Sequence, residues 1–440
     1  MHYREKCVRA GLLSLGVAAL AWSITAQHGV SAAGQAVDAH DQARRSRFTP
    51  ATAPDEEAAP RTAALAVAAP TEAAAGFDNL TNGFTTQAIF NENKDAFEEV
   101  EVIADGLGPT YNAQSCRECH QNVVTGGASQ ITEQRTGHLI GGRFFDSQGG
   151  SLIASRATHP EATELVALGD TVRTFRISTN VLGAGFVEAV ANSTLIAIRD
   201  AQPSTMRGLA VVIPVLERPG QTRVGRFGWK SQHASLQSFA ADAYLNEMGI
   251  TSPLMPTENS ISGKDVTAYD TVTDPEDDGD DVVKFADFMR ATKAPSRGAQ
   301  TTAVRAGEQV FNSIGCNVCH TPTLTTSAPG TIINGGAMTV PASLGNKVIH
   351  PFSDYLLHDI GTSDGIPIQP TDEFVPTASR MRTAPLWGLR TRNRLMHDGL
   401  TFTREEAILR HAGQASVVTG RYRNLSTTNK SNLVAFLNSL

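Results

Sequence analysis

The sequence predicts a mainly α-helical protein in which two similar end domains flank an inserted middle segment of helices and a few short strands. Two observations lead to this fold class. The pattern C-x-x-C-H occurs twice, at 116–120 and at 316–320. The chain of 440 residues, 41% hydrophobic and 18% charged, is also long enough for two or three domains with cores of their own.

The spacing within each motif suits the covalent attachment of a c-type haem. On a helix, positions i, i+3 and i+4 share one face, so two thiols can reach the two vinyl groups along one porphyrin edge. The histidine that follows then ligates the iron. The alternative is a zinc site with cysteine and histidine ligands. We therefore expect two covalent haem c groups in two cytochrome c-like haem domains, attached at Cys116, Cys119, His120, Cys316, Cys319 and His320.

The N-terminus has the features of a secretory signal peptide, residues 1–33. A basic start precedes the apolar stretch Ala10–Ile24, which is too short for a permanent membrane span, and Ser31–Ala33 offers small residues for cleavage. The alternative is an uncleaved anchor. Export to the periplasm agrees with the motifs, because c-type haems are attached outside the cytoplasmic membrane. Since Cys7 lies in this peptide and the motifs use the other four cysteines, we expect no disulfide.

The rest of the N-terminal part divides into a linker and a haem region. Residues 34–76 are rich in Ala and Pro without hydrophobic periodicity, which predicts a disordered linker. Residues 77–160 form the predicted N-terminal haem c region, in which Gly126–Gly127 and Gly141–Gly142 mark loops.

The middle segment, residues 161–299, contains no haem motif. Hydrophobic periodicity predicts both strands and helices here. The predicted strands are Val172–Ser178 and Thr222–Trp229, and the predicted helices are Ser193–Asp200, Leu236–Met248 and Val282–Thr292.

Charge excludes some partners. The formal net charge of −7 gives no electrostatic basis for binding nucleic acid, although it suits a basic redox partner. The acidic run Asp274–Asp281 could bind calcium, but it lacks the twelve-residue loop that ends in Glu. A solvated turn before the next helix is the alternative.

The C-terminal region, residues 300–440, has the pattern of a cytochrome c domain. Gly307 and Phe311 lie on a predicted helix that leads into the second motif. Thr403 and Glu406 can form a capping box for a helix over 403–411. The last helix, which packs on the first in such domains, has one apolar face made of Leu433, Phe436, Leu437 and Leu440.

The second axial ligand of each iron decides whether the metal is closed or open to small molecules. For the C-terminal haem the candidate is Met396, 76 residues after His320, with simple packing of Met396 or ligation by His397 as alternatives. For the N-terminal haem the nearest candidate is His138, and His159 and His233 are others.

With these motifs in place, the chain resembles the bacterial di-haem cytochrome c peroxidase superfamily, and more closely its branch of di-haem oxidoreductases. The resemblance runs from about residue 77 to 440. The segments that carry it are Phe90–Asn93, Phe227–Lys230, Ala241–Tyr244, Asn246–Thr251, Phe285–Met289, Leu357–Gly361, Arg382–Leu386 and Met396–Gly399.

The resemblance implies a periplasmic peroxidase. The C-terminal haem, with Met396 as its ligand and His358 nearby, would accept an electron from a small cytochrome c or cupredoxin and pass it to the N-terminal haem, which reduces hydrogen peroxide. Glu133 and His138 are the acid–base candidates, and Trp229 is a candidate relay unless it only packs in the core. The alternatives are a non-catalytic electron-transfer cytochrome and an oxidase or oxygenase of an organic or protein substrate.

Overall fold

The structure, a computed structural model, describes residues 69–147, 149–260, 263–369 and 374–440. Of these residues, 32% are in helices and 16% in strands, so helix is the more frequent element, with more strand than the sequence suggested. The predicted signal peptide and the linker as far as residue 68 lie outside the described residues. In the described part of the chain, no helix is both long and apolar enough to cross a membrane.

Most predicted helices are present within a few residues of their expected bounds. The helix predicted over 236–248 is α6, which continues as the π-helical turn η4 (Tyr244–Met248). The capping box of α9 is confirmed, because the Thr403 hydroxyl accepts from the Glu406 amide at 3.1 Å. The α-helices are α2 (Gln87–Glu98), α3 (Cys116–Cys119), α4 (Ala184–Glu188), α5 (Asn192–Ala201), α6 (Leu236–Ala243), α7 (Asp280–Ala291), α8 (Thr302–Ile314), α9 (Arg404–Leu409), α10 (Ser416–Arg423) and α11 (Thr427–Leu437).

The strands are short except for two. Strand β7 confirms the prediction for 172–178, whereas the strand predicted over 222–229 is only β9 and then becomes a loop. The strands are β1 (Thr71–Glu72), β2 (Thr110–Tyr111), β3 (Thr132–Ile140), β4 (Arg143–Phe145), β5 (Leu152–Ile153), β6 (Arg156–Ala157), β7 (Val172–Ile177), β8 (Val212–Pro214), β9 (Thr222–Val224), β10 (Leu324–Thr325), β11 (Ile332–Ile333), β12 (Met338–Thr339), β13 (Lys347–Ile349), β14 (Leu357–His358) and β15 (Met381–Arg382).

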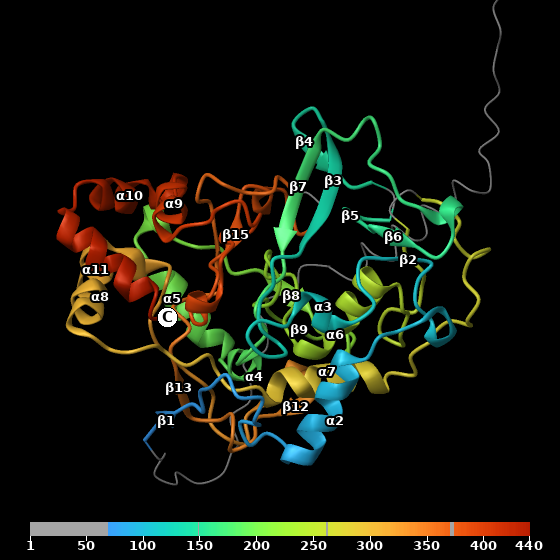
Figure 1. The fold of residues 1–440 in the computed structure, drawn as a ribbon, viewed down its shortest axis with the longest axis horizontal. Coiled ribbons are helices and arrows are strands. Elements are labelled where there is room, and N and C mark those ends of the chain that lie inside the picture. Colours follow the sequence, from blue (N-terminus) through green and yellow to red (C-terminus); the bar gives the residue numbers. More distant parts are fainter. Residues whose placement is uncertain (1–68, 148, 261–262, 370–373) are drawn as a thin grey trace, which may run out of the picture. The chain divides into compact units, whose positions relative to one another are not determined.

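The main sheet was not predicted. Strand β3 pairs with β4, β5 and β7, and its register with β7 runs antiparallel from Thr132–Ile177 to Gly137–Val172 (Figure 1). The sequence of β3, TEQRTGHLI, lacks the apolar–polar alternation by which a half-buried strand is recognised. The sheet joins the region predicted as the N-terminal haem domain to the one predicted as the middle segment, across residue 160.

Two helix pairs form the cores around the motifs. Around the first motif, α2 packs on α7 through Phe90, Phe97 and Phe288, with ring centroids of Phe97 and Phe288 4.7 Å apart. Around the second, α8 packs on α11, as Figure 1 shows, and the predicted apolar face of α11 is buried. Gly307 permits this close approach, because a Cβ there would collide with the Asn432 carbonyl oxygen.

Residues near the predicted domain boundaries are also part of the folded structure. Strand β1, inside the predicted linker, pairs in parallel with β13 at Thr71–Lys347. The predicted domain boundaries themselves stay predictions.

Candidate haem sites

The first C-x-x-C-H motif forms the single turn α3. The Ser115 hydroxyl caps this turn by accepting from the Arg117 amide at 3.2 Å, and His120 follows at its C-terminal end. The ring of His120 lies 6.1 Å from that of Phe97, centroid to centroid. Burial lowers the pKa of His120 to about 4, which nearby backbone groups of Thr179 and Gly127 counteract only in part. Its imidazole is therefore neutral, the form that binds metals.

The second motif follows directly on α8. The helix ends at Gly315, whose φ of 98° needs a glycine, and the chain turns through Cys316–Val318 to His320. The Nδ1 atom of His320 bonds to the Phe352 carbonyl oxygen at 2.9 Å. Such a bond fixes the ring and leaves Nε2 for a metal, which is the usual arrangement of a ligating histidine.

The four thiols agree with covalent haem attachment. None is in a disulfide. Burial raises the pKa of Cys116, Cys119 and Cys316 to about 12, so the unmodified side chains are neutral thiols near neutral pH. Cys119 is the second cysteine of the first motif, and Cys319 is the second cysteine of the second motif.

Residue His358 supports the second motif, in agreement with the role that the resemblance implies. Its Nδ1 lies 3.6 Å from the Cys319 sulfur and its Nε2 2.8 Å from Asp354 Oδ2. The Asp354 carboxylate also accepts from Gln202 at 2.7 Å. The trio of Cys319, Asp354 and His358 has three potential metal ligands, one fewer than a closed zinc site requires.

A cluster of arginines suits the propionate groups of a haem. The Nε and Nη2 atoms of Arg392 are buried without a hydrogen-bond partner. Burial, and then the charges of Arg382 and Arg404, lower the pKa of Arg392 to about 10. Donors left unpaired among like charges are costly unless an anion accompanies them, and haem supplies two carboxylates. The residues present therefore fit a haem.

The candidate second ligands of the C-terminal haem are differently placed. Met396 lies in a tight turn with φ of 63°, bracketed by the bridge between Leu395 and Thr401. The adjacent His397 is buried and its ring lies 6.3 Å from that of Trp229. The ring of His411, which the sequence analysis did not consider, lies 6.4 Å from that of His320.

A half-buried pair of carboxyls lies near the first motif. Glu133 Oε1 accepts from Arg135 Nε at 2.6 Å, and Glu247 Oε2 accepts from Asn112 Nδ2 at 3.1 Å. The two carboxyls also hydrogen-bond to each other. Both raise the pKa of Cys119 through their charge, so this carboxyl pair lies next to the haem attachment site.

The pKa values of the two carboxyls shift in opposite directions. Burial alone would raise the pKa of Glu133, but Arg135 and Glu247 hold it below its ordinary value. Burial, and then the charge of Glu133, raise the pKa of Glu247 well above its ordinary value. The pKa values of the two carboxyls are therefore driven apart, with that of Glu133 lowered and that of Glu247 raised, as expected for neighbouring carboxyls that disfavour a second negative charge. Glu247 was within a segment that carries the resemblance, but only the fold brings it to Glu133.

The structure separates Glu133 from the other acid–base candidate, His138. Both lie on β3, but a separation of five residues places them on opposite faces of a strand. His138 stacks on Phe145 at 5.7 Å and lies 3.6 Å from Asp170. Of the other histidine candidates, His159 caps a short turn. His233 Nε2 lies 3.0 Å from a carboxylate oxygen of Asp242, and Asp242 is on α6, just before the η4 turn that carries Glu247.

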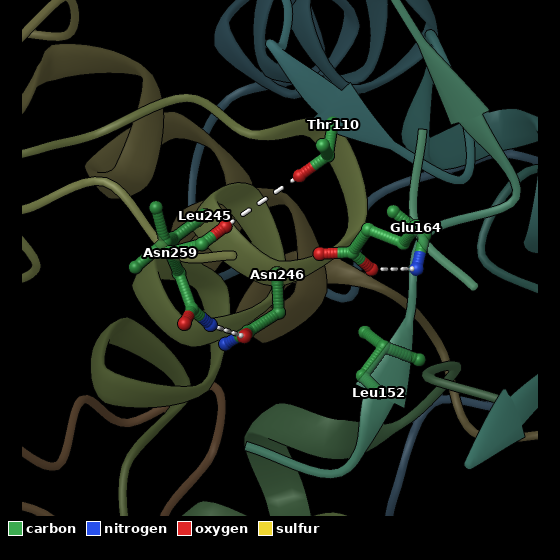
Figure 2. Close-up of a pocket in the computed structure, with 7 residues that line it drawn as sticks. Thr110, Leu152, Glu164, Leu245, Asn246 and Asn259 are labelled. Carbon is green, nitrogen blue, oxygen red and sulfur yellow. Dashed lines mark hydrogen bonds between the residues drawn. The ribbon is translucent and has the colours of Figure 1, made fainter. Parts of the chain in front are cut away.

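Two further polar features lie near this region. A small pocket has Thr110, Leu152, Glu164, Leu245, Asn246 and Asn259 in its lining, and Figure 2 shows that polar groups around it bond to one another, as Asn259 does to Asn246 at 2.8 Å. A separate cluster has four carboxyl oxygens within 4.8 Å of one another, a spacing that could hold a metal ion. Its residues are Glu258, Asp270, Asp274 and Glu276. Burial, and then its acidic neighbours, raise the pKa of Glu258 to about 9.

Residues 152–440 match the family described as "Di-haem oxidoreductase, putative peroxidase", a range that includes the second motif and begins after the first. No curated protein matches. Among solved structures, hydrazine synthase from Kuenenia stuttgartiensis is 13% identical over 87% of this chain and 100% of its own, with a TM-score of 0.39. A MauG-like protein associated with microbial copper homeostasis is 14% identical over 85% of this chain and 93% of its own, with a TM-score of 0.38.

The family match covers about two thirds of the chain and agrees with the haem-binding features described above. The chain belongs to the di-haem oxidoreductase family.

Proposed function

We propose that this protein is a periplasmic di-haem c-type enzyme that reduces hydrogen peroxide with electrons from a small redox protein. The observation that carries the proposal is the pair of hydrogen-bonded carboxyls, Glu133 and Glu247, close enough to the first motif for their charges to act on Cys119. Reduction of one peroxide to two waters needs two electrons and two protons. A group that holds a proton next to a redox centre is the element that a peroxidase needs and a pure electron carrier does not.

The haems would be covalently attached, at Cys116 and Cys119 and at Cys316 and Cys319, with His120 and His320 as ligands. When bound, they supply two iron centres that exchange electrons one at a time. The Phe352 carbonyl would orient His320. Burial lowers the pKa of both imidazoles to about 4, which keeps them in the neutral form that binds iron.

Glu247 would donate the proton that the departing oxygen of peroxide requires. Glu133, kept ionised by Arg135, would hold that proton on Glu247 and take up the next one from solvent. The exposed fraction of the Glu133 side chain is 18%, so the carboxyl pair retains limited access to its surroundings.

Electrons would enter at the C-terminal haem from a small cytochrome c or cupredoxin. The acidic balance of the chain, −7, favours a basic donor. Trp229 is a candidate relay: it donates from Nε1 to the Ile177 carbonyl at 2.7 Å and contacts His397 edge to face. These contacts hold its indole rigidly.

Calcium is a further proposed ligand. The four carboxyls of Glu258, Asp270, Asp274 and Glu276 have the oxygen donors that calcium prefers. Asp274 and Glu276 belong to the acidic run Asp274–Asp281, whereas Glu258 and Asp270 come from the chain that precedes it. Calorimetric titration with calcium measures the binding affinity of the purified di-haem protein. The same titration of the Glu258→Gln variant should give weaker binding.

Electron paramagnetic resonance tests the central proposal. A high-spin ferric signal in the oxidised protein, or after one electron has been added, is expected because peroxide needs an open iron. Two low-spin haems in both states would instead favour the non-catalytic electron-transfer cytochrome.

Turnover then tests the carboxyl pair. Glu247→Gln is expected to lower the rate of peroxide reduction by about 10²-fold to 10⁴-fold, the usual contribution of a general acid. The exposed Glu99→Gln is the matched control and should retain the rate. Retained turnover in Glu247→Gln would contradict this role for the residue, and turnover of an organic substrate without peroxide would favour the oxidase alternative.

A further inference from the structure

The geometry points to His411 as the second axial ligand of the C-terminal haem, opposite His320, in the place that the sequence assigned to Met396. This goes beyond the proposed function, because it concerns the electron-accepting haem and stands whether or not peroxide is the substrate.

The separation of the two rings is the first observation. Metal–imidazole bonds are about 2.0–2.1 Å for zinc, and a ring centroid lies roughly 1.1 Å behind its nitrogen, so two imidazoles on opposite sides of one metal have centroids roughly 6 Å apart. The centroids of His320 and His411 are 6.4 Å apart, with an angle of 57° between the ring planes. The angle between the planes excludes parallel stacking of the two rings.

The hydrogen bonds of both rings select the same nitrogen. His320 Nδ1 bonds to the Phe352 carbonyl oxygen at 2.9 Å, and His411 Nδ1 bonds to the Ala407 carbonyl oxygen at 2.7 Å. Each carbonyl accepts the Nδ1 proton and thereby sets the tautomer whose Nε2 has a free lone pair. Both histidines therefore have the tautomer that can ligate a metal through Nε2, and their ring centroids are separated by the distance expected for two ligands of one metal.

The backbone around His411 holds this ring in place. Its carbonyl oxygen accepts from Thr419 Oγ1 at 2.7 Å, and its amide donates to Ile408 at 3.1 Å. The amide of Ala412 donates to Ile360 at 2.8 Å, which ties this turn to the segment after His358.

The loop that contains Met396 appears in the structure as a support for His411. Asp398, two residues after Met396, binds Arg410 through both carboxylate oxygens, at 3.1 and 2.5 Å. Arg410 also donates to Thr401 Oγ1 at 2.6 Å. Arg410 directly precedes His411, so the segment 396–401 positions the end of α9 and with it the His411 ring.

Ligation by two histidines has a functional consequence. A Met ligand raises the reduction potential of a c-type haem, so replacing it with His leaves the haem at a lower potential. The physiological donor would then be a redox protein of low potential.

The experiment compares His411→Ala with Met396→Leu in the purified, oxidised di-haem protein, by optical and electron paramagnetic resonance spectra. We expect His411→Ala to convert one low-spin haem to high spin, and added imidazole to restore the low-spin signal. Met396→Leu should leave the spectrum unchanged. A His411→Ala protein that keeps the native low-spin signals, or a Met396→Leu protein that loses one, would overturn the inference.

A second variant covers the case in which His411→Ala does not fold. His411→Met retains a side chain able to bind iron, and we expect it to keep a low-spin haem while the midpoint potential of that haem rises in a redox titration. An unchanged potential would also overturn the inference. Neither readout depends on peroxide, so failure of the proposed peroxidase activity would leave this test intact.

Discussion

Glu247 shows how a single residue acquires its chemistry from its surroundings. Its carboxyl bonds to Glu133 and Asn112, and burial and the neighbouring negative charge raise its pKa well above the usual value. A glutamate in an unfolded chain has a pKa of about 4.3. At pH values between the unfolded pKa and the raised folded pKa, the folded protein binds more protons than the unfolded chain. Over this pH range the contribution of Glu247 to stability therefore falls as the pH rises.

Glu247→Gln removes that titration. We therefore expect the melting temperature of the variant to fall less than that of the wild type as the pH is raised from about 5 towards the alkaline range. Thermal melts of the di-haem protein followed by circular dichroism measure the difference. Equal pH dependence in the two proteins would show that Glu247 ionises normally in the fold.

Glu188 is the opposite case, a buried glutamate that is kept charged. It is fully buried and bonds to Arg290 Nε at 2.8 Å, to the Leu236 amide at 2.8 Å and to Asn334 Nδ2 at 2.9 Å. Burial alone would raise the pKa of Glu188, but Arg290 and these donors lower it. This stabilisation is present above the unfolded pKa and is lost as the pH falls through the lowered folded pKa.

Glu188→Gln leaves the Arg290 guanidinium short of its buried counter-charge. We expect a loss of about 3–5 kcal/mol in the free energy of unfolding at neutral pH, with a smaller loss in acid. Urea unfolding at two pH values checks both the size and the trend. The exposed Glu92→Gln serves as control and should change stability by less than about 0.5 kcal/mol.

At the scale of elements, the contact of α8 with α11 fixes the frame of the second haem site. The two helices approach so closely at Gly307 that a Cβ would lie against the backbone of Asn432 and the side chain of Phe436. Phe436 in turn packs on Phe311 and Phe352, 5.2 and 5.6 Å between centroids. The carbonyl of Phe352 holds His320, so the spacing of these helices is transmitted to the haem ligand.

Gly307→Ala should therefore force the helices apart and lower the free energy of unfolding by about 1–3 kcal/mol, the cost of overpacking a core. Gly420→Ala, on α10 with open space around its Cα, should instead be neutral or stabilise by up to about 1 kcal/mol. Urea unfolding of both variants gives the comparison. Similar effects in the two proteins would mean that the α8–α11 contact is not close-packed.

For the whole molecule, the two motifs predict two separately attached haems. Cys116→Ala/Cys119→Ala and Cys316→Ala/Cys319→Ala should each lose one covalent haem, so the haem-to-protein ratio falls by half in either variant. Haem staining on denaturing gels and intact-protein mass spectrometry measure this. Retention of both haems by either variant would disprove covalent attachment at that motif.

Much of this organisation can be read from the sequence. The C-x-x-C-H motifs, the capping box at Thr403 and the apolar face of α11 depend on residues close together in the chain, and local spacing determines them. The strand β3 escaped prediction because pairing with β7 across an intervening stretch of chain, and not its own pattern, makes it a strand.

The candidate sites also combine features that depend on local sequence with features that depend on contacts between distant segments. The sequence by itself determined which residues are predicted to bind haem in each motif, because both thiols and the histidine must follow one another on one turn. Only the tertiary structure brought Glu247 to Glu133, a separation of 114 positions in the chain, and turned His411 towards His320, 91 positions away. A pKa shift or an axial ligand depends on distance in space, and distance in space between residues so far apart is decided by packing.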